Sequence, residues 1–208
     1  MKNSIFSRKN KIFLVLALFF AINSSVFGNT VTYKEEWYSL YRETYQQNSD
    51  EILQNMYYLE QSAKADFCNP QFALAKIENE TQWEKYRYLF MMNVNLKLIE
   101  QHMRMARLFD KKKIYFYDVQ YREEYLRNLE KAKVYYTACY AYWEEAKIWA
   151  DKANMGKFNF MYLTDVQKWE DDKSRIVNGK LNYQKILDRE ISRINKNIEE
   201  LKALPEME

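Results

Sequence analysis

Glycine and proline are rare in this sequence, with three glycines and two prolines among 208 residues. Both residues end helices and form turns, so their scarcity argues against a loop-rich fold and favours a few long helices. It also leaves no glycine-rich phosphate loop, and there is no Gly-x-Ser-x-Gly motif. The sequence therefore predicts an all-α protein without a recognisable nucleotide or hydrolase site.

Histidine and cysteine are also scarce: His102 is the single histidine, and Cys68 and Cys139 are the two cysteines. No Glu stands three residues before His102, so the Glu-x-x-His signature of di-iron bundles is missing, and zinc would need further ligands. A cysteine nucleophile would need His102 as its base, and the pattern assigns Cys68 to a turn and Cys139 to a packed seam. We therefore predict no catalytic residues, no metal and no cofactor, and we interpret His102 as an ordinary residue of a polar helix face.

The first 28 residues have the pattern of an export signal. Residues 12–22 are an unbroken apolar run, and small residues follow it up to Gly28. A membrane-spanning helix needs about 20 apolar residues, and this run is shorter. We therefore predict a secretory signal peptide over residues 1–28, cleaved after Gly28, and a single helical bundle domain over residues 29–208. Export to the periplasm is the expected location, with an extracellular location as the alternative, and no membrane span is expected after cleavage.

Cleavage would change the charge of the protein. The signal contains four basic residues and no acid, and its loss would leave 28 basic against 29 acidic residues. A nearly neutral protein lacks the positive charge that drives binding to phosphate backbones. Nucleic acid is therefore not expected as a partner.

The helix-breaking and helix-capping residues after the signal divide the chain into about four helices, near 33–66, 70–108, 115–154 and 164–203. Candidate breaks within them are Asn48-Ser49-Asp50 and Asn178-Gly179. Asn69-Pro70 has the composition of a helix start, and Thr164 to Gln167 has the spacing of a capping box. The predicted fold is an elongated antiparallel bundle of about four long helices with coiled-coil-like seams.

Two seams show apolar residues at alternating gaps of three and four, which is typical of a helix that packs on another helix. The third helix has a column of small residues at every seventh position, which would let a neighbouring backbone approach closely: Ala132, Cys139, Ala146 and Ala153. This helix is apolar over much of its circumference, so we expect it at the centre of the bundle. The fourth helix ends in an apolar seam: Leu187, Ile191, Ile194, Ile198 and Leu201. We favour packing of this second seam on the bundle, with a homodimer through the same residues as the alternative.

The hairpin geometry predicts that the cysteines do not pair. If the second and third helices turn near residues 111–113, Cys139 lies level with Trp83, and Cys68 lies about 20 Å further along the hairpin. A disulfide requires Cα atoms within about 7 Å of each other. We therefore expect two free thiols, with Cys139 in the core.

Aromatic residues are unusually frequent: after cleavage, 30 of 180 residues would be Phe, Trp or Tyr. One interpretation is a bundle core with Tyr hydroxyls reaching water, and the other is a surface for a protein or a glycan. The candidate partner surface comprises aromatic clusters near the bundle ends and an adjacent lysine run: Tyr57, Tyr58, Tyr115, Phe116, Tyr117, Lys111, Lys112 and Lys113. We interpret the lysine run as a solvated turn, with attraction of an acidic partner as the alternative.

The alternation of Ala with Tyr and Trp over Ala132–Ala153 resembles the helices of tetratricopeptide-type repeats. The resemblance covers about 25 residues and lacks the 34-residue period. It implies a protein-interaction scaffold. We therefore hypothesise an exported, non-enzymatic structural or adaptor protein that binds protein partners in a cell-envelope assembly. The alternatives are a periplasmic holdase-like chaperone and a helical bundle with an aromatic pocket for a sugar or a hydrophobic ligand.

Overall fold

The structure is a computed structural model that describes residues 31–205, so the predicted signal peptide lies outside the described residues. Within this range the chain forms six α-helices and no strand, which confirms the all-α prediction: α2 (Lys34–Gln47), α3 (Ile52–Lys64), α4 (Glu80–Phe109), α5 (Arg122–Ala153), α6 (Gln167–Val177) and α7 (Tyr183–Ala203). Four short 3-10 turns lie between them: η1 (Pro70–Phe72), η2 (Phe116–Tyr121), η3 (Gly156–Phe158) and η4 (Thr164–Val166). No helix in the described range combines the length and apolar character that a membrane crossing requires.

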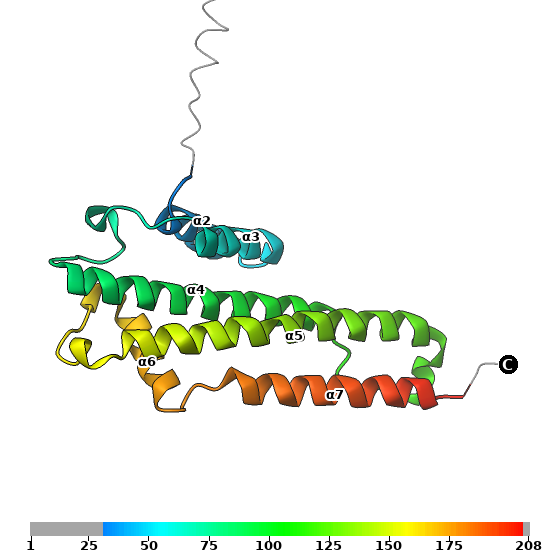
Figure 1. Cartoon of the computed structure of the whole chain (residues 1–208). Helices are drawn as coiled ribbons and strands as arrows, with labels where there is room; N and C mark the ends of the chain where they lie inside the picture. The colour runs from blue at the N-terminus through cyan, green and yellow to red at the C-terminus, as the bar shows by residue number, and fades with distance from the viewer. Residues whose placement is uncertain (1–30, 206–208) are drawn as a thin grey trace, which may run out of the picture. The chain divides into compact units, whose positions relative to one another are not determined.

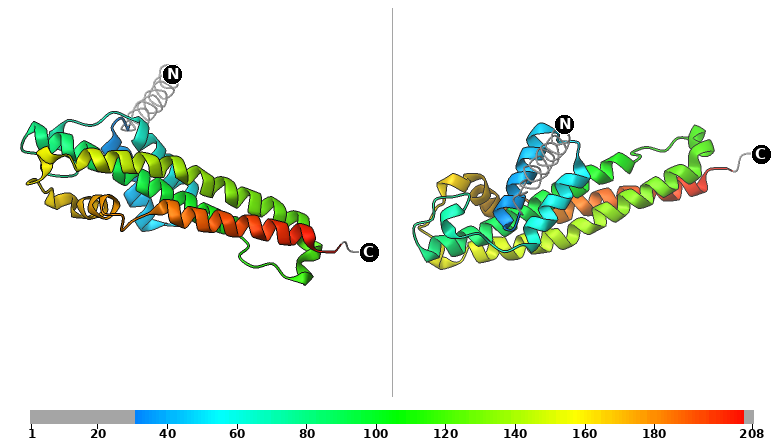
Figure 2. Two further views of the ribbon diagram at one scale, coloured as in Figure 1. Left: turned by 60° about the horizontal axis from the view of Figure 1, so that its bottom comes forward. Right: turned by 90° about the horizontal axis from the view of Figure 1, so that it is seen from above.

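The longest helices, α4 and α5, form an antiparallel pair (Figure 1). Helix α7 runs along the other side of α5, and the hairpin of α2 and α3 packs on α4 (Figure 2). Helix α5 contacts α4, α6 and α7, so it has the central position expected of the third predicted helix.

The small residues of α5 explain how closely its neighbours approach. Ala132, Cys139, Ala146 and Ala153 are all completely buried. Small side chains at a helix interface allow the facing backbone to come near, and the Cys139 sulfur lies 3.8 Å from the carbonyl oxygen of Ile99 on α4. The small residues predicted to form the seam of the third helix are thus buried at a helix interface in the structure.

The seam of α7 packs within the chain, as the favoured interpretation expected. Leu187, Ile194, Ile198 and Leu201 are buried, and Ile191 is partly buried. Helix α7 packs on α5. A homodimer through this seam would have to displace α7 from α5, and it stays a prediction.

The expectation of about four long helices is not confirmed, because the first and last predicted helices are each divided. The first ends at Gln47 and resumes at Ile52, at the candidate break. The last is divided at Gly179, whose φ of 67° belongs to the left-handed region that glycine adopts without strain. Both divisions fall at positions that the sequence had marked.

The segment before α4 differs from the prediction. Asn69 and Pro70 begin only the three-residue turn η1, and α4 starts ten residues later, where the Asn79 side chain accepts a hydrogen bond from the Gln82 amide at 2.9 Å. Residues 73–79 are held in a non-helical course by distant groups. The Tyr86 hydroxyl accepts a hydrogen bond from the Leu74 amide at 3.1 Å.

The capping box predicted at Thr164 does not form. Thr164 begins the turn η4 instead, and the Asp165 carboxylate accepts a hydrogen bond from the Lys76 amide at 2.7 Å. The Asp165 carboxylate thus helps to hold the segment before α4 in place.

The two cysteines are free and buried, as predicted. Burial raises the pKa of the Cys139 thiol to about 12, so this thiol stays protonated near neutral pH. The predicted register of the hairpin was wrong, however, since Cys139 lies opposite Ile99 and not opposite Trp83. The reason is the long connection over residues 110–121, which shifts the start of α5.

His102 is a buried residue, which corrects its interpretation as a polar-face residue. Its Nδ1 atom hydrogen-bonds to the carbonyl oxygen of Leu98 at 2.9 Å, and its ring lies 4.9 Å from that of Tyr142. Burial lowers the pKa of His102 below its ordinary value of 6.5. Folding therefore disfavours protonation of this imidazole.

This burial predicts a pH-dependent stability. As the pH falls below 6.5, the unfolded chain takes up a proton at His102 that the folded chain resists, so the free energy of unfolding decreases. The slope contributed by one such group is at most about 1.4 kcal/mol per pH unit. Urea unfolding between pH 7.5 and pH 5 should show a steeper decrease for the wild type than for His102→Asn. Equal slopes would contradict the prediction, because the sequence has no other histidine.

Candidate functional site

The connection between α4 and α5 carries the largest predicted aromatic cluster, and we call residues 111–121 the aromatic loop. Tyr115, Phe116 and Tyr117 are 44%, 83% and 57% exposed, and Tyr121 is exposed as well. The rings of Tyr115 and Tyr117 are stacked with their centroids 5.1 Å apart, and Phe116 meets Tyr117 edge to face at 5.5 Å. The rings thus contact one another while large parts of their surfaces face solvent.

The backbone of the aromatic loop is fixed by a buried acid. The Asp118 carboxylate accepts a hydrogen bond from the Tyr115 amide at 2.8 Å and pairs with the Lys111 ammonium at 3.1 Å. The same ammonium lies over the ring of Tyr125 on α5, 4.1 Å from its centroid. The inward-facing carboxylate orders the turn that presents the rings.

Helix α7 holds the start of the aromatic loop. Asn197 donates a hydrogen bond to the carbonyl oxygen of Lys111 at 2.6 Å. One residue earlier, the buried Asp110 carboxylate accepts a hydrogen bond from Arg193 Nη1 at 3.0 Å. The rings are therefore displayed on a segment anchored to two helices.

The predicted lysine run is divided by this arrangement. Lys111 is engaged with Asp118 and Tyr125, whereas Lys112 and Lys113 are exposed. Two of the three predicted cations thus remain available to an acidic partner. Beside the loop, Val119 to Glu124, Arg127 and Pro205 line a groove of about 490 Å³.

The other predicted aromatic pair lies elsewhere. Tyr57 and Tyr58 are on α3 and pack against Trp37 of α2, with centroid distances of 5.9 and 6.1 Å. Tyr57 is exposed, while Tyr58 is half-buried and its hydroxyl accepts a hydrogen bond from Gln54. The structure therefore does not join this pair to the aromatic loop.

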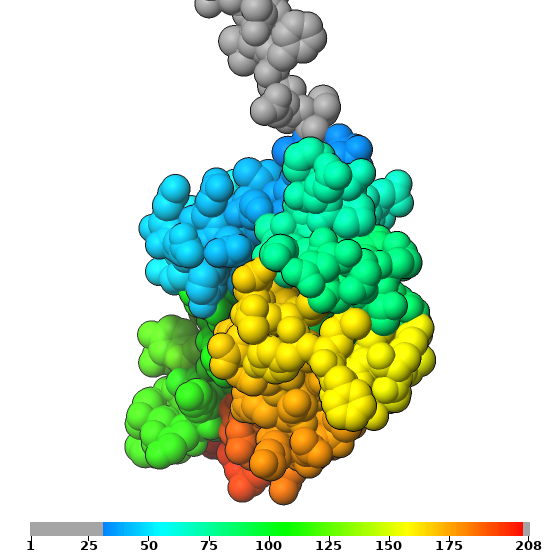
Figure 3. Space-filling view, turned by 90° about the vertical axis from the view of Figure 1, so that its left-hand side faces the viewer, coloured from blue at the N-terminus to red at the C-terminus, as the bar shows by residue number. Residues whose placement is uncertain are grey.

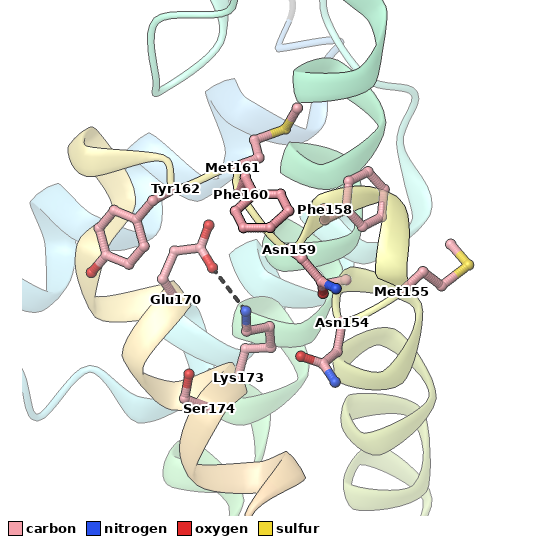
Figure 4. A pocket seen from close by; sticks show the side chains of 11 residues that line it. Asn154, Met155, Phe158, Asn159, Phe160, Met161, Tyr162, Glu170, Lys173 and Ser174 are labelled. Atoms are coloured by element: carbon pink, nitrogen blue, oxygen red, sulfur yellow. Dashed lines mark ion pairs between the residues drawn. The ribbon is translucent and has the colours of Figure 1, made fainter.

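A second exposed cluster, not predicted from the sequence, lies at the other end of α5. The segment of residues 155–163 follows this helix, and Figure 3 shows it in yellow beside the orange residues of α6. Phe160 is fully exposed and Tyr162 is exposed, and they lie beside a pocket of about 370 Å³ (Figure 4). We call this the tip pocket. It is lined by residues 153–155, 158–162, 170, 173 and 174.

A buried ion-pair cluster lies at the tip pocket. Lys85 of α4 places its ammonium 2.5 Å from Glu170 Oε1, and both side chains are 1% exposed. Lys173 pairs with the other carboxylate oxygen at 3.1 Å. Burial lowers the pKa of Lys85, although the Glu170 carboxylate acts in the opposite direction.

The same cluster holds the segment of residues 155–163 in place. The Lys85 ammonium donates a hydrogen bond to the carbonyl oxygen of Met161, and the Leu163 amide donates one to Glu170 Oε1 at 3.2 Å. One carboxylate thus connects α4, α6 and the segment between α5 and α6.

Part of this site had a signal in the sequence. Phe158, Phe160 and Tyr162 place an aromatic ring at every second position just after Gly156, much as the aromatic loop concentrates its rings. Lys85 and Glu170 had no such signal, because they are 85 positions apart and each resembles a surface charge of a helix.

Within residues 31–205, no group of three or more His, Cys, Asp or Glu side chains is arranged to hold a metal ion. The candidate sites in the described residues are the aromatic loop and the tip pocket.

Comparison with known proteins identifies a family. The model of a domain of unknown function, DUF8513, matches residues 81–204, which extend from the first turn of α4 to the end of α7. No curated protein and no solved structure matches the chain. The hairpin of α2 and α3 precedes the matched region, whereas the aromatic loop and the tip pocket lie inside it. Since the match covers more than half of the sequence, the chain belongs to the DUF8513 family.

Proposed function

We propose that the protein is an exported, non-enzymatic adaptor that binds a protein partner through the aromatic loop within a cell-envelope assembly. The observation that carries the proposal is the exposure of Tyr115, Phe116 and Tyr117 on an anchored turn. The export component rests on the sequence of residues 1–28, with the periplasm as the expected compartment.

The anchoring supports recognition for an energetic reason. Aromatic side chains contribute much of the binding energy at protein interfaces. Immobilising flexible side chains and loops on binding costs free energy, so a surface that is already ordered loses less. In the aromatic loop, ring stacking and the bonds of Asp118 provide this order before a partner arrives.

The flanking charges support an acidic partner. Lys112 and Lys113 are exposed beside the rings. A protein segment that combines apolar side chains with Asp or Glu would match both features, and the charges would accelerate association. The proposed partner is therefore an acidic, partly apolar protein surface.

Affinity purification from the native envelope after mild cross-linking tests this proposal. We expect the wild type to recover one assembly reproducibly and the triple variant Tyr115→Ser, Phe116→Ser, Tyr117→Ser to recover at least about tenfold less, which corresponds to about 1.4 kcal/mol of binding energy. Because these rings face solvent, the triple variant should unfold at nearly the wild-type temperature.

Phe72→Ser is the matched control, since Phe72 is an aromatic residue exposed to 73% in η1, outside the aromatic loop. It should recover the assembly like the wild type. Full recovery by the triple variant would exclude the aromatic loop as the binding surface. A spread of unfolded clients in place of one assembly would favour the holdase-like chaperone instead.

A further inference from the structure

We infer that the tip pocket binds a sugar that carries a carboxylate, such as a uronic acid. The inference goes beyond the proposed adaptor function and concerns the opposite end of α5. It rests on three features of the pocket: the balance of charge around Glu170, a set of unengaged polar side chains, and an exposed aromatic ring (Figure 4).

The charge at the pocket favours an anion. One carboxylate, that of Glu170, is paired with two ammonium groups, those of Lys85 and Lys173. Lys85 also donates to the Met161 carbonyl oxygen, whereas Lys173 has Glu170 as its partner and lies at the pocket wall. An ammonium has three donors, so Lys173 retains the capacity to bind a ligand carboxylate. Because Lys85 pairs with Glu170 from behind the pocket wall, a ligand carboxylate would serve as the counter-charge of Lys173.

The neighbouring polar groups favour a ligand with hydroxyls. Asn154, Asn159 and Ser174 line the pocket, and in the described part of the chain their side chains make no hydrogen bond. In the view of Figure 4 both carboxamides lie on the side of Lys173 that faces away from Glu170. Carboxamides donate and accept at once, which suits the vicinal hydroxyls of a sugar ring.

The ring of Phe160 supplies an apolar surface. Phe160 makes none of the ring contacts found elsewhere in the described chain and is completely exposed. An aromatic face can cover the C–H face of a pyranose while the polar groups bind its hydroxyls. The volume of about 370 Å³ lies within the range of roughly 300–1,000 Å³ for small-molecule sites.

Saturation-transfer NMR and isothermal titration calorimetry of the full mature protein test the inference, with D-glucuronate, D-glucose and benzoate as probes. We expect D-glucuronate to bind, D-glucose to bind at least about tenfold more weakly because it lacks the charge-assisted hydrogen bond, and benzoate to bind more weakly than D-glucuronate because it lacks hydroxyls. Absence of D-glucuronate binding, equal binding of D-glucose, or tighter binding of benzoate would each overturn the inference.

Variants locate the binding. Phe160→Ala and Asn159→Ala should each weaken D-glucuronate binding without lowering the unfolding temperature, because both side chains are exposed. Lys173→Gln should remove the preference for D-glucuronate over D-glucose. Phe72→Ala is the control and should bind D-glucuronate like the wild type. Wild-type binding by Phe160→Ala and Asn159→Ala together would show that the sugar binds elsewhere, against the inference.

Discussion

Glu170→Gln is expected to lower the free energy of unfolding by about 3–5 kcal/mol, because it leaves the Lys85 ammonium buried without a counter-charge. The lysine side chain is 1% exposed and joins the first turns of α4 to α6. The glutamine has nearly the same volume and can still accept a hydrogen bond from the Leu163 amide. The loss therefore reports charge rather than packing, and urea unfolding near pH 7 measures it.

A double variant separates the cost of leaving the Lys85 charge unpaired from the net contribution of the ion pair to stability. Replacing both partners, as Lys85→Met with Glu170→Gln, removes the unpaired charge and should recover most of the stability lost in Glu170→Gln alone. Glu199→Gln is the matched control, since Glu199 is an exposed acid on α7 and should have almost no effect. A single variant Glu170→Gln as stable as the wild type would mean that the pair is not buried as described.

Phe90→Ala is expected to cost about 3–5 kcal/mol, the range found for truncating large buried aromatic residues. Phe90 is completely buried on α4. Its ring lies 5.4 Å from that of Tyr38, 5.5 Å from that of Phe67 and 5.7 Å from that of Trp169. The substitution therefore removes contacts to α2, to the segment after α3 and to α6 in a single change.

The loss of protection from hydrogen exchange in Phe90→Ala should be uneven along the chain. Because Tyr38 of α2 and Phe67 after α3 pack on the Phe90 ring, hydrogen exchange in α2 and α3 should accelerate more than in the middle of α5. Leu108→Ala on the same helix is the control, since Leu108 is 68% exposed. Uniform acceleration across all helices would contradict a local role of the Phe90 cluster.

The parts of the fold that the sequence predicted are those governed by neighbouring residues. The periodic seam of α5 needs only its own spacing, and the division at Gly179 needs only the backbone freedom of glycine. The course of residues 73–79 could not be predicted, because it depends on bonds from Tyr86 and from Asp165, and the latter lies 89 positions from Lys76.

The aromatic loop and the tip pocket also differ in how far neighbouring residues in the sequence predict them. The exposure of the aromatic loop was indicated by three successive rings next to three lysines, although the withdrawal of Lys111 toward Asp118 was not. The tip pocket depends on Lys85 meeting Glu170 across the fold, and no local pattern distinguishes these residues from other charges on helix surfaces.

The continuity of α5 has a consequence for how the two surfaces could work together. The helix extends without interruption over 32 residues, from the end of the aromatic loop to the segment that forms the tip pocket. At 1.5 Å per residue this is a spacer of about 48 Å. A protein partner at one end and an acidic sugar at the other would be held at a fixed separation. If both proposals hold, α5 would act as a rigid spacer that sets the distance between the bound protein and the bound sugar.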